Sequence, residues 1–352
     1  MIVCDNCGNK NPEGYNFCDQ CFSPIYPSDL FEPIYDRKGN NFFDLNEGYE
    51  FAKRYIIKRK IGRTGGIGST YLANDTQKDG ALVSLKVIRT GLITSKKIYK
   101  KLENLFNKLN SLQNEALANV IDYGIYEKIY YAVFQYIKGE DLIKILEKRE
   151  SGFKNRELTT IFMQLVEVLD FAHSNDLVHG ALSPFNVIYS EKEKKIGIID
   201  FGLVDILTSE RRSLLKEDGA LGMSLFYTAP EILRGGKSTR YTDLYSIGAI
   251  MYEISCNYLP FKSHSSYRLV TYVLNKTPKR PSLINPDLPL YITDPIMKLL
   301  SKDPRDRYSS AKELLEVLKR SSKKELYSRL LWVVAIGFEV ALLTYIIMLL
   351  IR

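Results

Sequence analysis

Four of the five cysteines of this 352-residue chain lie in its first 21 residues, where they form two Cys-x-x-Cys pairs. The pairs are Cys4 with Cys7 and Cys18 with Cys21, and ten residues separate them. Each pair can place two thiolates on one side of a tight turn, and two such pairs complete a tetrahedral Zn²⁺ site. We therefore predict a structural zinc site in a segment so short that metal binding supplies its folding free energy.

Other chemistry for these cysteines stays open. They could form two disulfides, which a reducing cytosol opposes, or hold a different thiophilic ion. Redox chemistry is not expected, because no βαβ pattern surrounds either pair. The flanking segment NPEGYNFC resembles the zinc ribbons found at the ends of many prokaryotic proteins, so we expect a zinc ribbon that makes protein contacts. Cys256 lies in an apolar helical context and is predicted to be a buried thiol.

A second group of chemically suggestive residues lies between His179 and Gly202, in HGALSPFNVIYSEKEKKIGIIDFG. This stretch resembles the catalytic centre of protein kinases, in which an H-R-D-x-x-x-x-N loop and a D-F-G turn are joined by a short hairpin. The D-F-G aspartate is Asp200, which follows an apolar strand and comes 14 residues after Asn186, as the resemblance requires. The resemblance implies that Asn186 and Asp200 bind Mg²⁺.

Two catalytic positions of that loop carry residues that cannot perform the family's chemistry. Ala181 occupies the position of the catalytic Asp, and Ser183 that of the Lys two residues later. In an active kinase the Asp accepts the proton of the substrate hydroxyl, and the Lys neutralises the transferring phosphoryl group. Gly180 replaces an Arg that in many kinases pairs with a phosphorylated loop. Asp176 precedes the loop and is not expected to act as a substitute base.

The segments IIKRKIGRTGGIGSTYLAND and ALVSLKVI resemble the first three strands of a kinase, with a glycine-rich hairpin over the nucleotide phosphates. Glycine lets backbone N–H groups approach phosphate closely. Lys86 is then the ligand of the α- and β-phosphates, with a solvated strand lysine as the alternative. The expected glycines are Gly62, Gly65, Gly66 and Gly68. Their spacing places the family's first glycine at Arg63 unless Thr64 is an insertion, so we expect the tip of the hairpin to be altered. Thr70 follows at the position where the family usually has a Val that packs on adenine.

The nucleotide base is expected to meet the segment IYYAVFQYIKGEDL, which matches the fifth strand and the hinge of the family. Phe134 would be the gatekeeper, and the backbone from Gln135 to Ile137 would face adenine. The acidic partner of Lys86 is less well defined. Glu103 is the only acid in the helical period over 96–112, whereas the register of the following segment puts Leu105 at the ion-pairing position. A Lys86–Glu103 pair is therefore a hypothesis.

Downstream residues match positions that maintain the architecture of the family. Ser224 and Tyr227 precede an Ala-Pro-Glu triplet that resembles the peptide-positioning loop and ends at Glu231. Asp243 matches the buried acid that braces the catalytic loop, and Arg307 matches the partner of Glu231. The resemblance covers about residues 55–318 and is closest to bacterial serine/threonine kinases. It implies a bilobal α+β fold with a β-rich amino-terminal lobe and a helical carboxyl-terminal lobe.

The carboxyl-terminal segment LLWVVAIGFEVALLTYIIMLLI, over 330–351, is long and apolar enough for one transmembrane helix, which needs about 20 residues. A helix buried in a soluble protein is the alternative. Basic residues precede the segment, at Lys319, Arg320, Lys323, Lys324 and Arg329. They predict a single-pass carboxyl-terminal anchor in the cell membrane with the kinase-like domain cytoplasmic, and they could attract anionic lipids. Glu339 costs about 2.5–3.5 kcal/mol in a bilayer, and self-association through it is a hypothesis.

Composition and organisation complete the sequence-based prediction. Hydrophobic residues make up 45% and charged residues 26%, as in folded proteins, and the net charge of +8 forms no basic, aromatic-rich stripe, so no nucleic-acid partner is expected. Residues 1–21 are polar and lack an apolar core segment, so we expect no signal peptide there. We expect a zinc ribbon over 1–25, a linker over 26–50, a kinase-like domain over 51–320, a basic segment over 321–329 and the membrane helix.

The function predicted from these features is that of a membrane-tethered pseudokinase, which binds ATP and Mg²⁺ with weak or absent phosphotransfer and presents a signalling scaffold to a cytoplasmic protein. Two alternatives stay open. One is an active serine/threonine kinase with a non-standard base, because positioning and metal electrostatics supply much of phosphoryl-transfer catalysis. The other is a structural adaptor that binds no nucleotide.

Overall fold

A computed structural model describes most of the chain. The described residues are 2–3, 8–11, 45–62, 67–89, 92–93, 95–127, 129–149, 152–208, 225–263, 265–323, 336–337 and 339. The four cysteines of the predicted zinc site lie outside them, as do Gly65, Gly66, Ser224 and all but three residues of the segment over 330–351. Within the described part of the chain, no helix has the length and apolarity needed to cross a bilayer. Those residues also contain no group of three or more His, Cys, Asp or Glu side chains placed to hold a metal ion.

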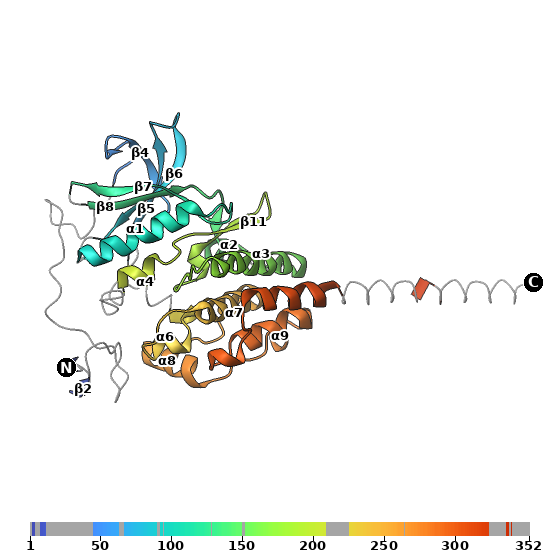
Figure 1. Cartoon of the computed structure of the whole chain (residues 1–352). Coiled ribbons are helices and arrows are strands. Elements are labelled where there is room, and N and C mark those ends of the chain that lie inside the picture. Colours follow the sequence, from blue (N-terminus) through green and yellow to red (C-terminus); the bar gives the residue numbers. More distant parts are fainter. Residues whose placement is uncertain are drawn as a thin grey trace, which may run out of the picture.

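The amino-terminal lobe is built on a six-stranded antiparallel sheet (Figure 1). In spatial order its strands are β3 (Glu50–Phe51), β4 (Tyr55–Lys60), β5 (Gly68–Asp75), β6 (Ala81–Ile88), β8 (Ile129–Gln135) and β7 (Val120–Tyr126). Burial alternates along the first part of β4, where Tyr55 and Ile57 are buried and Ile56 is exposed, as expected for neighbouring side chains that point to opposite faces. The glycine-rich segment joins β4 to β5, and β6 pairs with β5, so Lys86 lies next to that segment. A separate short pair, β1 (Ile2–Val3) with β2 (Lys10–Asn11), lies near the amino terminus.

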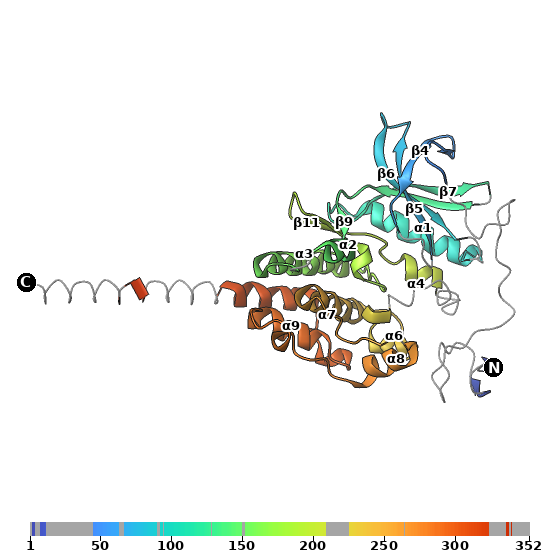
Figure 2. The ribbon, with the colours of Figure 1, turned by 180° about the vertical axis from the view of Figure 1, so that it is seen from behind.

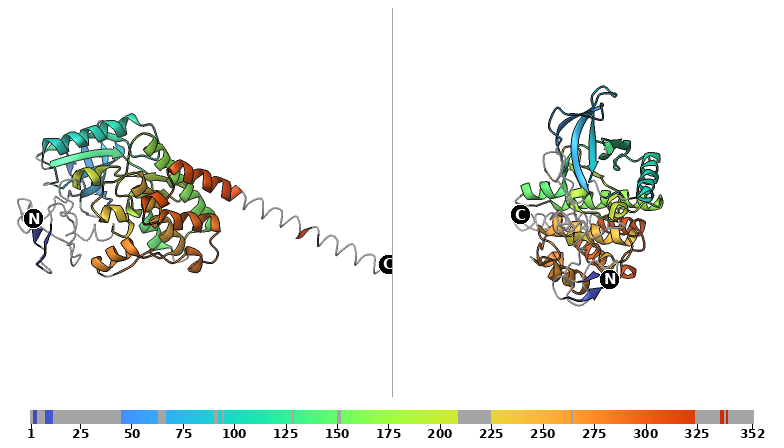
Figure 3. Two further views of the ribbon diagram at one scale, coloured as in Figure 1. Left: turned by 60° about the horizontal axis from the view of Figure 1, so that its bottom comes forward. Right: turned by 90° about the vertical axis from the view of Figure 1, so that its left-hand side faces the viewer.

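One helix, α1 (Lys96–Ser111), covers a face of this sheet (Figure 3). The hydroxyl of Ser95 caps it by accepting a hydrogen bond from the backbone N–H of Ile98. Apolar residues recur at helical spacing and are buried; they are Ile98, Leu102, Leu105, Phe106 and Leu109. This apolar stripe holds α1 against the sheet and against the residues that follow the D-F-G turn.

The carboxyl-terminal lobe is helical and packs around α7 (Arg240–Cys256), whose residues 242–255 are all buried. Helices α3 (Asn155–Ser174) and α9 (Leu290–Leu299) pack against α7 (Figures 2 and 3). The other helical elements are α2 (Leu142–Lys148), α4 (Leu203–Thr208), α6 (Pro230–Leu233), α8 (Ser266–Asn275), a helix over 311–323, and the 3₁₀ turns η1 (Pro184–Asn186), η3 (Leu225–Tyr227), η4 (Pro281–Leu283) and η5 (Pro304–Asp306). A small sheet has the order β11 (Lys195–Ile198), β10 (Val187–Ser190), β9 (Glu140–Asp141).

This two-lobed arrangement confirms the predicted α+β fold, with strands in the first lobe and helices in the second. The small sheet joins the predicted catalytic hairpin, β10–β11, to the chain that arrives from the first lobe. Cys256 is half-buried at the end of α7, where burial raises the pKa of its thiol to about 12 and keeps it protonated.

Candidate nucleotide-binding site

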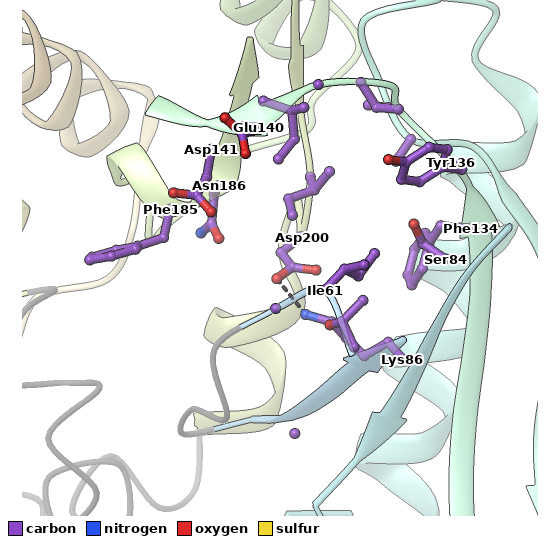
Figure 4. A pocket seen from close by; sticks show the side chains of 18 of the residues that line it. Ile61, Ser84, Lys86, Phe134, Tyr136, Glu140, Asp141, Phe185, Asn186 and Asp200 are labelled. Atoms are coloured by element: carbon purple, nitrogen blue, oxygen red, sulfur yellow. Dashed lines mark hydrogen bonds and ion pairs between the residues drawn. The ribbon is translucent and has the colours of Figure 1, made fainter. Parts of the chain in front are cut away.

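A cavity of about 290 Å³ lies between the two lobes, close to the lower end of the range for small-molecule sites (Figure 4). The sheet contributes Gly62, Gly68, Thr70, Ser84 and Lys86, the connection contributes Phe134 to Ile137, and the second lobe contributes Asp141, Lys144, Ala181, Ser183, Asn186, Ile188 and Asp200. The fold therefore brings every described residue of the predicted nucleotide and magnesium sites to one cavity.

The glycine-rich segment is described at its two ends, Gly62 and Gly68. Gly68 has φ +149°, and a Cβ there would collide with the carbonyl oxygen of Val87 on the paired strand β6. Only glycine fits this position, because the backbones of β5 and β6 approach too closely for a side chain. The glycine-rich segment thus leads into β5 directly beside β6, the strand that carries Lys86.

The end of the cavity near the connection is apolar, with two hydroxyl side chains from the sheet. Phe134 is buried, and its ring meets that of Phe106 edge-on at 6.1 Å between centroids. In the sheet register Ser84 pairs with Phe134, and Thr70 pairs with Lys86. Ile188 of β10 lines the cavity from the second lobe. A flat aromatic base would be held here by apolar contacts while the backbone at 135–137 offers hydrogen-bonding groups.

Lys86 and Asp200 face each other across the cavity, with 2.5 Å between Nζ and a carboxylate oxygen (Figure 4). Both side chains are nearly buried, at 7% and 11% exposed. Asp200 has φ +64°, an uncommon left-handed conformation for a residue other than glycine, and Gly202 follows at +66°. Backbone strain of this kind clusters at functional sites, where it aims a side chain.

The hypothesis of a Lys86–Glu103 ion pair is wrong. Lys86 makes its ion pair with Asp200, whereas Glu103 lines a small depression between α1 and strands β7 and β8. Leu105 instead faces the D-F-G turn, because a Cβ on Gly202 would lie 3.1 Å from its side chain. Two residues correspond to about 200° of helix rotation, so Glu103 points to the other side of α1 when Leu105 points to the turn.

A buried carboxylate braces the catalytic loop from below. Asp243 accepts hydrogen bonds from the backbone N–H groups of His179 and Gly180, both at 2.8 Å, and pairs with His173 Nε2 at 2.9 Å. Burial lowers the pKa of His179, so its imidazole is neutral. The Nδ1 atom accepts from the Ala181 N–H, which leaves Nε2 to donate to the Ile199 carbonyl at 3.0 Å. The loop is held as the family resemblance implies.

The same loop lacks reactive groups at its two catalytic positions. Ala181 and Ser183 both line the cavity, and Ser183 is 4% exposed. The side-chain amide of Asn186 donates to the Ala181 carbonyl oxygen at 3.2 Å, which leaves the Asn186 side-chain oxygen for other partners. The methyl group of Ala181 can neither accept a proton nor orient a hydroxyl.

Gly180 is fixed by its surroundings as well as by its backbone. It has φ +78°, and a Cβ would lie 3.1 Å from the hydroxyl of Ser238 and 3.2 Å from Cβ of Asp205. Ser238 Oγ donates to the Asp205 carboxylate at 2.8 Å. Helix α4, which carries Asp205, therefore packs where a side chain at position 180 would begin.

Every acidic side chain that lines the cavity in the described residues has a lysine partner. Asp200 pairs with Lys86 at 2.5 Å, Asp141 with Lys144 at 2.8 Å, and Glu140 with Lys148 at 2.6 Å. The cavity thus offers no free carboxylate from its described lining to replace the missing base.

Sequence reasoning missed several of the lining residues, among them Asp141 and Lys144. Asp141 also caps α2, with its carboxylate accepting from the Lys144 N–H at 3.0 Å, and the ammonium of Lys144 reaches the Ile61 carbonyl oxygen at 3.4 Å. A capping signature at Asp141 was visible in the sequence, but it predicts a helix start and says nothing about a cavity. The contact between Lys144 and the first lobe depends on how the lobes face each other.

The peptide-positioning region retains its predicted ion pair. Arg307 donates to both carboxylate oxygens of Glu231 at 2.8 Å, and the Arg307 side chain is fully buried. Burial alone would raise the pKa of Glu231, but the hydrogen bonds and charge of Arg307 lower it. Tyr227 donates to the buried Glu253 carboxylate at 2.5 Å. These contacts anchor the loop that follows η3.

A family model described as "Protein kinase domain" matches residues 55–318, most of the chain. The chain belongs to the protein kinase family. It is 28% identical over 267 residues to serine/threonine-protein kinase PrkC of Bacillus subtilis, a match that covers 76% of this chain and 40% of PrkC. It is also 28% identical over 270 residues to a probable serine/threonine-protein kinase PknB of Lactococcus lactis, covering 76% of this chain and 42% of that protein. The kinase-family chain thus spans about two fifths of the length of these relatives.

Solved structures support the fold. The kinase domain of PknI from Mycobacterium tuberculosis superposes with a TM-score of 0.60 at 20% sequence identity, and the match covers 79% of this chain and 99% of that domain. The predicted membership in the bacterial-type serine/threonine kinase family is therefore confirmed. Membership implies binding of ATP and Mg²⁺.

Proposed function

We propose that this member of the kinase family binds MgATP in the cavity between its lobes and transfers phosphate weakly or not at all. In that role Lys86 would hold the nucleotide phosphates, and the oxygens of Asp200 and Asn186 would hold Mg²⁺, which prefers carboxylate and carbonyl ligands. All three line the cavity. The bound metal would neutralise phosphate charge, and the chain's own part is to position the nucleotide.

The single observation that carries the proposal is that the described cavity lining has no unpaired acidic side chain that could act as the base. Ala181 stands at the base position, and each acidic side chain in the described lining is paired with a lysine. A general base must lie within hydrogen-bond reach of the proton it removes. Because the base and the neighbouring lysine are both absent, we expect this chain to bind nucleotide without removing a proton from a substrate hydroxyl.

The wider biological role is also part of the proposal. A nucleotide-dependent scaffold would present one conformation to a cytoplasmic protein partner. Its support is that the architecture around the loop is kept while the reactive groups are not. The apolar segment over 330–351 and the basic residues before it support a carboxyl-terminal membrane anchor on sequence grounds, and self-association through Glu339 would occur there. The Cys-x-x-Cys pairs likewise support a structural Zn²⁺ ion at the amino terminus.

Nucleotide binding is tested by thermal unfolding of the full chain in detergent, with ATP alone and with MgATP. A ligand at about 100 times its Kd adds about 2.7 kcal/mol, which raises Tm by several degrees. We expect the rise to need Mg²⁺ and to disappear in Asp200→Asn. The matched control Asp294→Asn changes an exposed carboxylate, 59% exposed, and should keep the rise. No rise in the unchanged chain would indicate the structural adaptor instead.

An active kinase with a non-standard base is the second candidate, favoured by family membership and by the Lys86–Asp200 pair. Autophosphorylation with labelled ATP distinguishes it from the proposal. We expect weak or no transfer by the unchanged chain and much greater transfer after the joint change of Ala181→Asp and Ser183→Lys. Transfer by the unchanged chain that is as fast as that of the double variant and that Asp200→Asn abolishes would establish the active kinase.

A further inference from the structure

One end of the second lobe carries three large apolar side chains that are exposed to solvent. Tyr258 follows the last turn of α7, Leu283 ends η4, and Leu290 begins α9. Their exposed fractions are 54%, 64% and 64%, and the two leucines are the most exposed large apolar side chains in the described residues. We call these three residues the α9-end patch. Apolar side chains that gather in one exposed region mark an interaction surface, whereas scattered ones do not.

Hydrogen bonds place the members of the patch at the same end of the lobe. Asn285 joins η4 to the end of α7, because its side-chain amide donates to the Ser255 carbonyl oxygen at 3.1 Å. The side-chain amide of Asn155, the first residue of α3, donates to the Asp287 carbonyl oxygen at 2.6 Å. The end of α7, the start of α3 and the segment that leads into α9 therefore meet at the α9-end patch.

The helix over 311–323 ends in the same region. Lys319 of this helix pairs with Glu167 of α3 at 2.8 Å, so the two helices are neighbours. The carboxyl end of α3 leads to the catalytic loop beside α4, and the helix over 311–323 ends on the side of the lobe opposite α4, α6 and α8 (Figures 1 and 2). The start of α3, the α9-end patch and the end of this helix therefore share one end of the second lobe.

Exposed basic side chains lie at this end as well. They are Lys154 and Arg156 at the start of α3, and Arg320 and Lys323 in the last turn of the helix over 311–323. The exposed carboxylate of Asp287 opposes them, whereas Arg280 and Asp294 neutralise each other as an ion pair. Basic side chains beside exposed apolar ones form the combination that binds anionic lipid surfaces.

The chain length fixes how far this end can lie from the proposed membrane segment. Only six residues, 324–329, separate Lys323 from the apolar segment over 330–351. Seven peptide steps span at most about 25 Å, whereas a compact domain of this size is roughly 50 Å across. Because the proposed anchor places the apolar segment in the bilayer, the α9-end patch stays within reach of the lipid headgroups. Such a short tether raises the effective concentration of even a weak lipid contact.

We propose that the α9-end patch and its four basic neighbours form a docking surface for an anionic lipid bilayer, which holds the second lobe against the membrane in one orientation. The basic side chains would contact lipid headgroups, and the three apolar side chains would enter the boundary between headgroups and acyl chains. Tyrosine suits that boundary because its ring is amphipathic. The inference rests on the proposed membrane anchor and assigns a second lipid contact to the folded lobe itself.

The test uses the full chain in liposomes of phosphatidylglycerol and phosphatidylcholine whose brominated acyl chains quench tryptophan fluorescence inside the bilayer. The chain contains one tryptophan, Trp332, in the predicted anchor, so quenching of the unchanged chain reports on the anchor alone. Trp332→Phe combined with Leu290→Trp moves the reporter to the docking surface. The matched protein combines Trp332→Phe with Leu82→Trp, because Leu82 is 46% exposed on β6 of the other lobe.

We expect the reporter at position 290 to lose about half of its emission or more, because interfacial groups lie about 5–10 Å into the boundary region. The reporter at position 82 should lose almost none. In the protein with the reporter at position 290, Leu283→Ser should weaken the quenching and the matched Leu82→Ser should not. Asp287→Asn should strengthen the quenching, because it removes a negative charge that faces anionic lipid.

The contribution of charge is tested by changing the four basic neighbours of the patch to Gln. Quenching at position 290 should weaken about twofold or more, as it should when phosphatidylcholine replaces all the phosphatidylglycerol. The matched control removes the same charge from exposed lysines elsewhere and should leave the quenching unchanged; these are Lys58, Lys78, Lys97 and Lys237.

Four results would overturn this inference. Quenching of Trp332 without quenching at position 290 would show that the anchor inserts while the lobe stands away from the bilayer. Equal quenching at positions 290 and 82 would show that the lobe has no preferred orientation. Unquenched Trp332 would contradict the anchor and, with it, the docking. A blue shift at position 290 that grows with protein concentration in detergent and is absent in liposomes would assign the surface to a second copy of the chain.

Discussion

On one side of the cavity, Lys86 and Asp200 form an ion pair of 2.5 Å, and Asn186 lies in the same lining. On the other side, Ala181 and Ser183 occupy the positions at which the family performs proton transfer and charge neutralisation. The buried carboxylate of Asp243 holds the backbone of the loop that leads to Ala181, and His179 of that loop donates to the carbonyl of Ile199, the residue before Asp200. The comparison teaches that the loop architecture and the Lys86–Asp200 pair can be retained when the residues at the two catalytic positions are Ala181 and Ser183.

The largest effect is predicted for a substitution that removes the buried carboxylate of Asp243. Asp243→Ala would leave the N–H groups of His179 and Gly180 and the ring of His173 without their buried acceptor. We expect a loss of about 3–5 kcal/mol in the free energy of unfolding. Urea denaturation measures it, with the exposed Asp294→Ala as control. A loss of less than about 1 kcal/mol would show that the loop does not depend on this carboxylate.

The next effect concerns the Glu231–Arg307 pair, which supports the loop next to the catalytic side. Because the folded-state pKa of Glu231 lies below its ordinary value of 4.5, its contribution is fully present above that value and is lost as pH falls through the folded-state pKa. Glu231→Gln should lower the free energy of unfolding near neutral pH, since Arg307 is left buried without its partner. It should also reduce the further loss of stability as the pH falls below about 4.5. Urea denaturation as a function of pH measures both. An equal loss of stability on acidification in the unchanged chain and in Glu231→Gln would contradict the account.

The smallest effect distinguishes backbone conformation from packing at Gly180. Gly180→Ala places a Cβ near Ser238 and Asp205 in a left-handed conformation. Gly235→Ala is the matched control, because it has φ +86° with nothing within 4 Å of the added Cβ. Each change should cost about 1–2 kcal/mol for the backbone, and Gly180→Ala should cost more by up to about 1 kcal/mol. An equal loss of stability in the two variants would show that α4 can shift to accept the added methyl group at no cost.

Much of this site could be predicted from the sequence, because the decisive residues lie at fixed distances within local motifs. Asp200, Asn186, Lys86 and Phe134 all reach the cavity, and two-lobed packing follows from a family resemblance over most of the chain. The hypothesis of a Lys86–Glu103 pair is wrong, since a helical pattern fixes which residues share a face but does not show which face meets the lysine.

Contacts between elements far apart in the sequence could not be predicted in the same way. The reach of Lys144 to the Ile61 carbonyl and the packing of Asp205 beside Gly180 join residues far apart in sequence. Each depends on the relative placement of elements, which no local pattern encodes. The lysine partners of Asp141 and Glu140 are local by contrast, three and eight residues away, so the spacing of Asp141 and Lys144 could have indicated that pair.

The most direct test of the central claim combines binding and chemistry in one sample. Isothermal titration of the full chain with γ-labelled MgATP would measure binding, and the same mixture would then be analysed for label on protein and for free phosphate. We predict saturable binding that requires Mg²⁺ and Asp200, with little or no label transferred and little or no phosphate released. Label on most of the protein or rapid hydrolysis, either of them abolished by Asp200→Asn, or an absence of binding, would contradict the account.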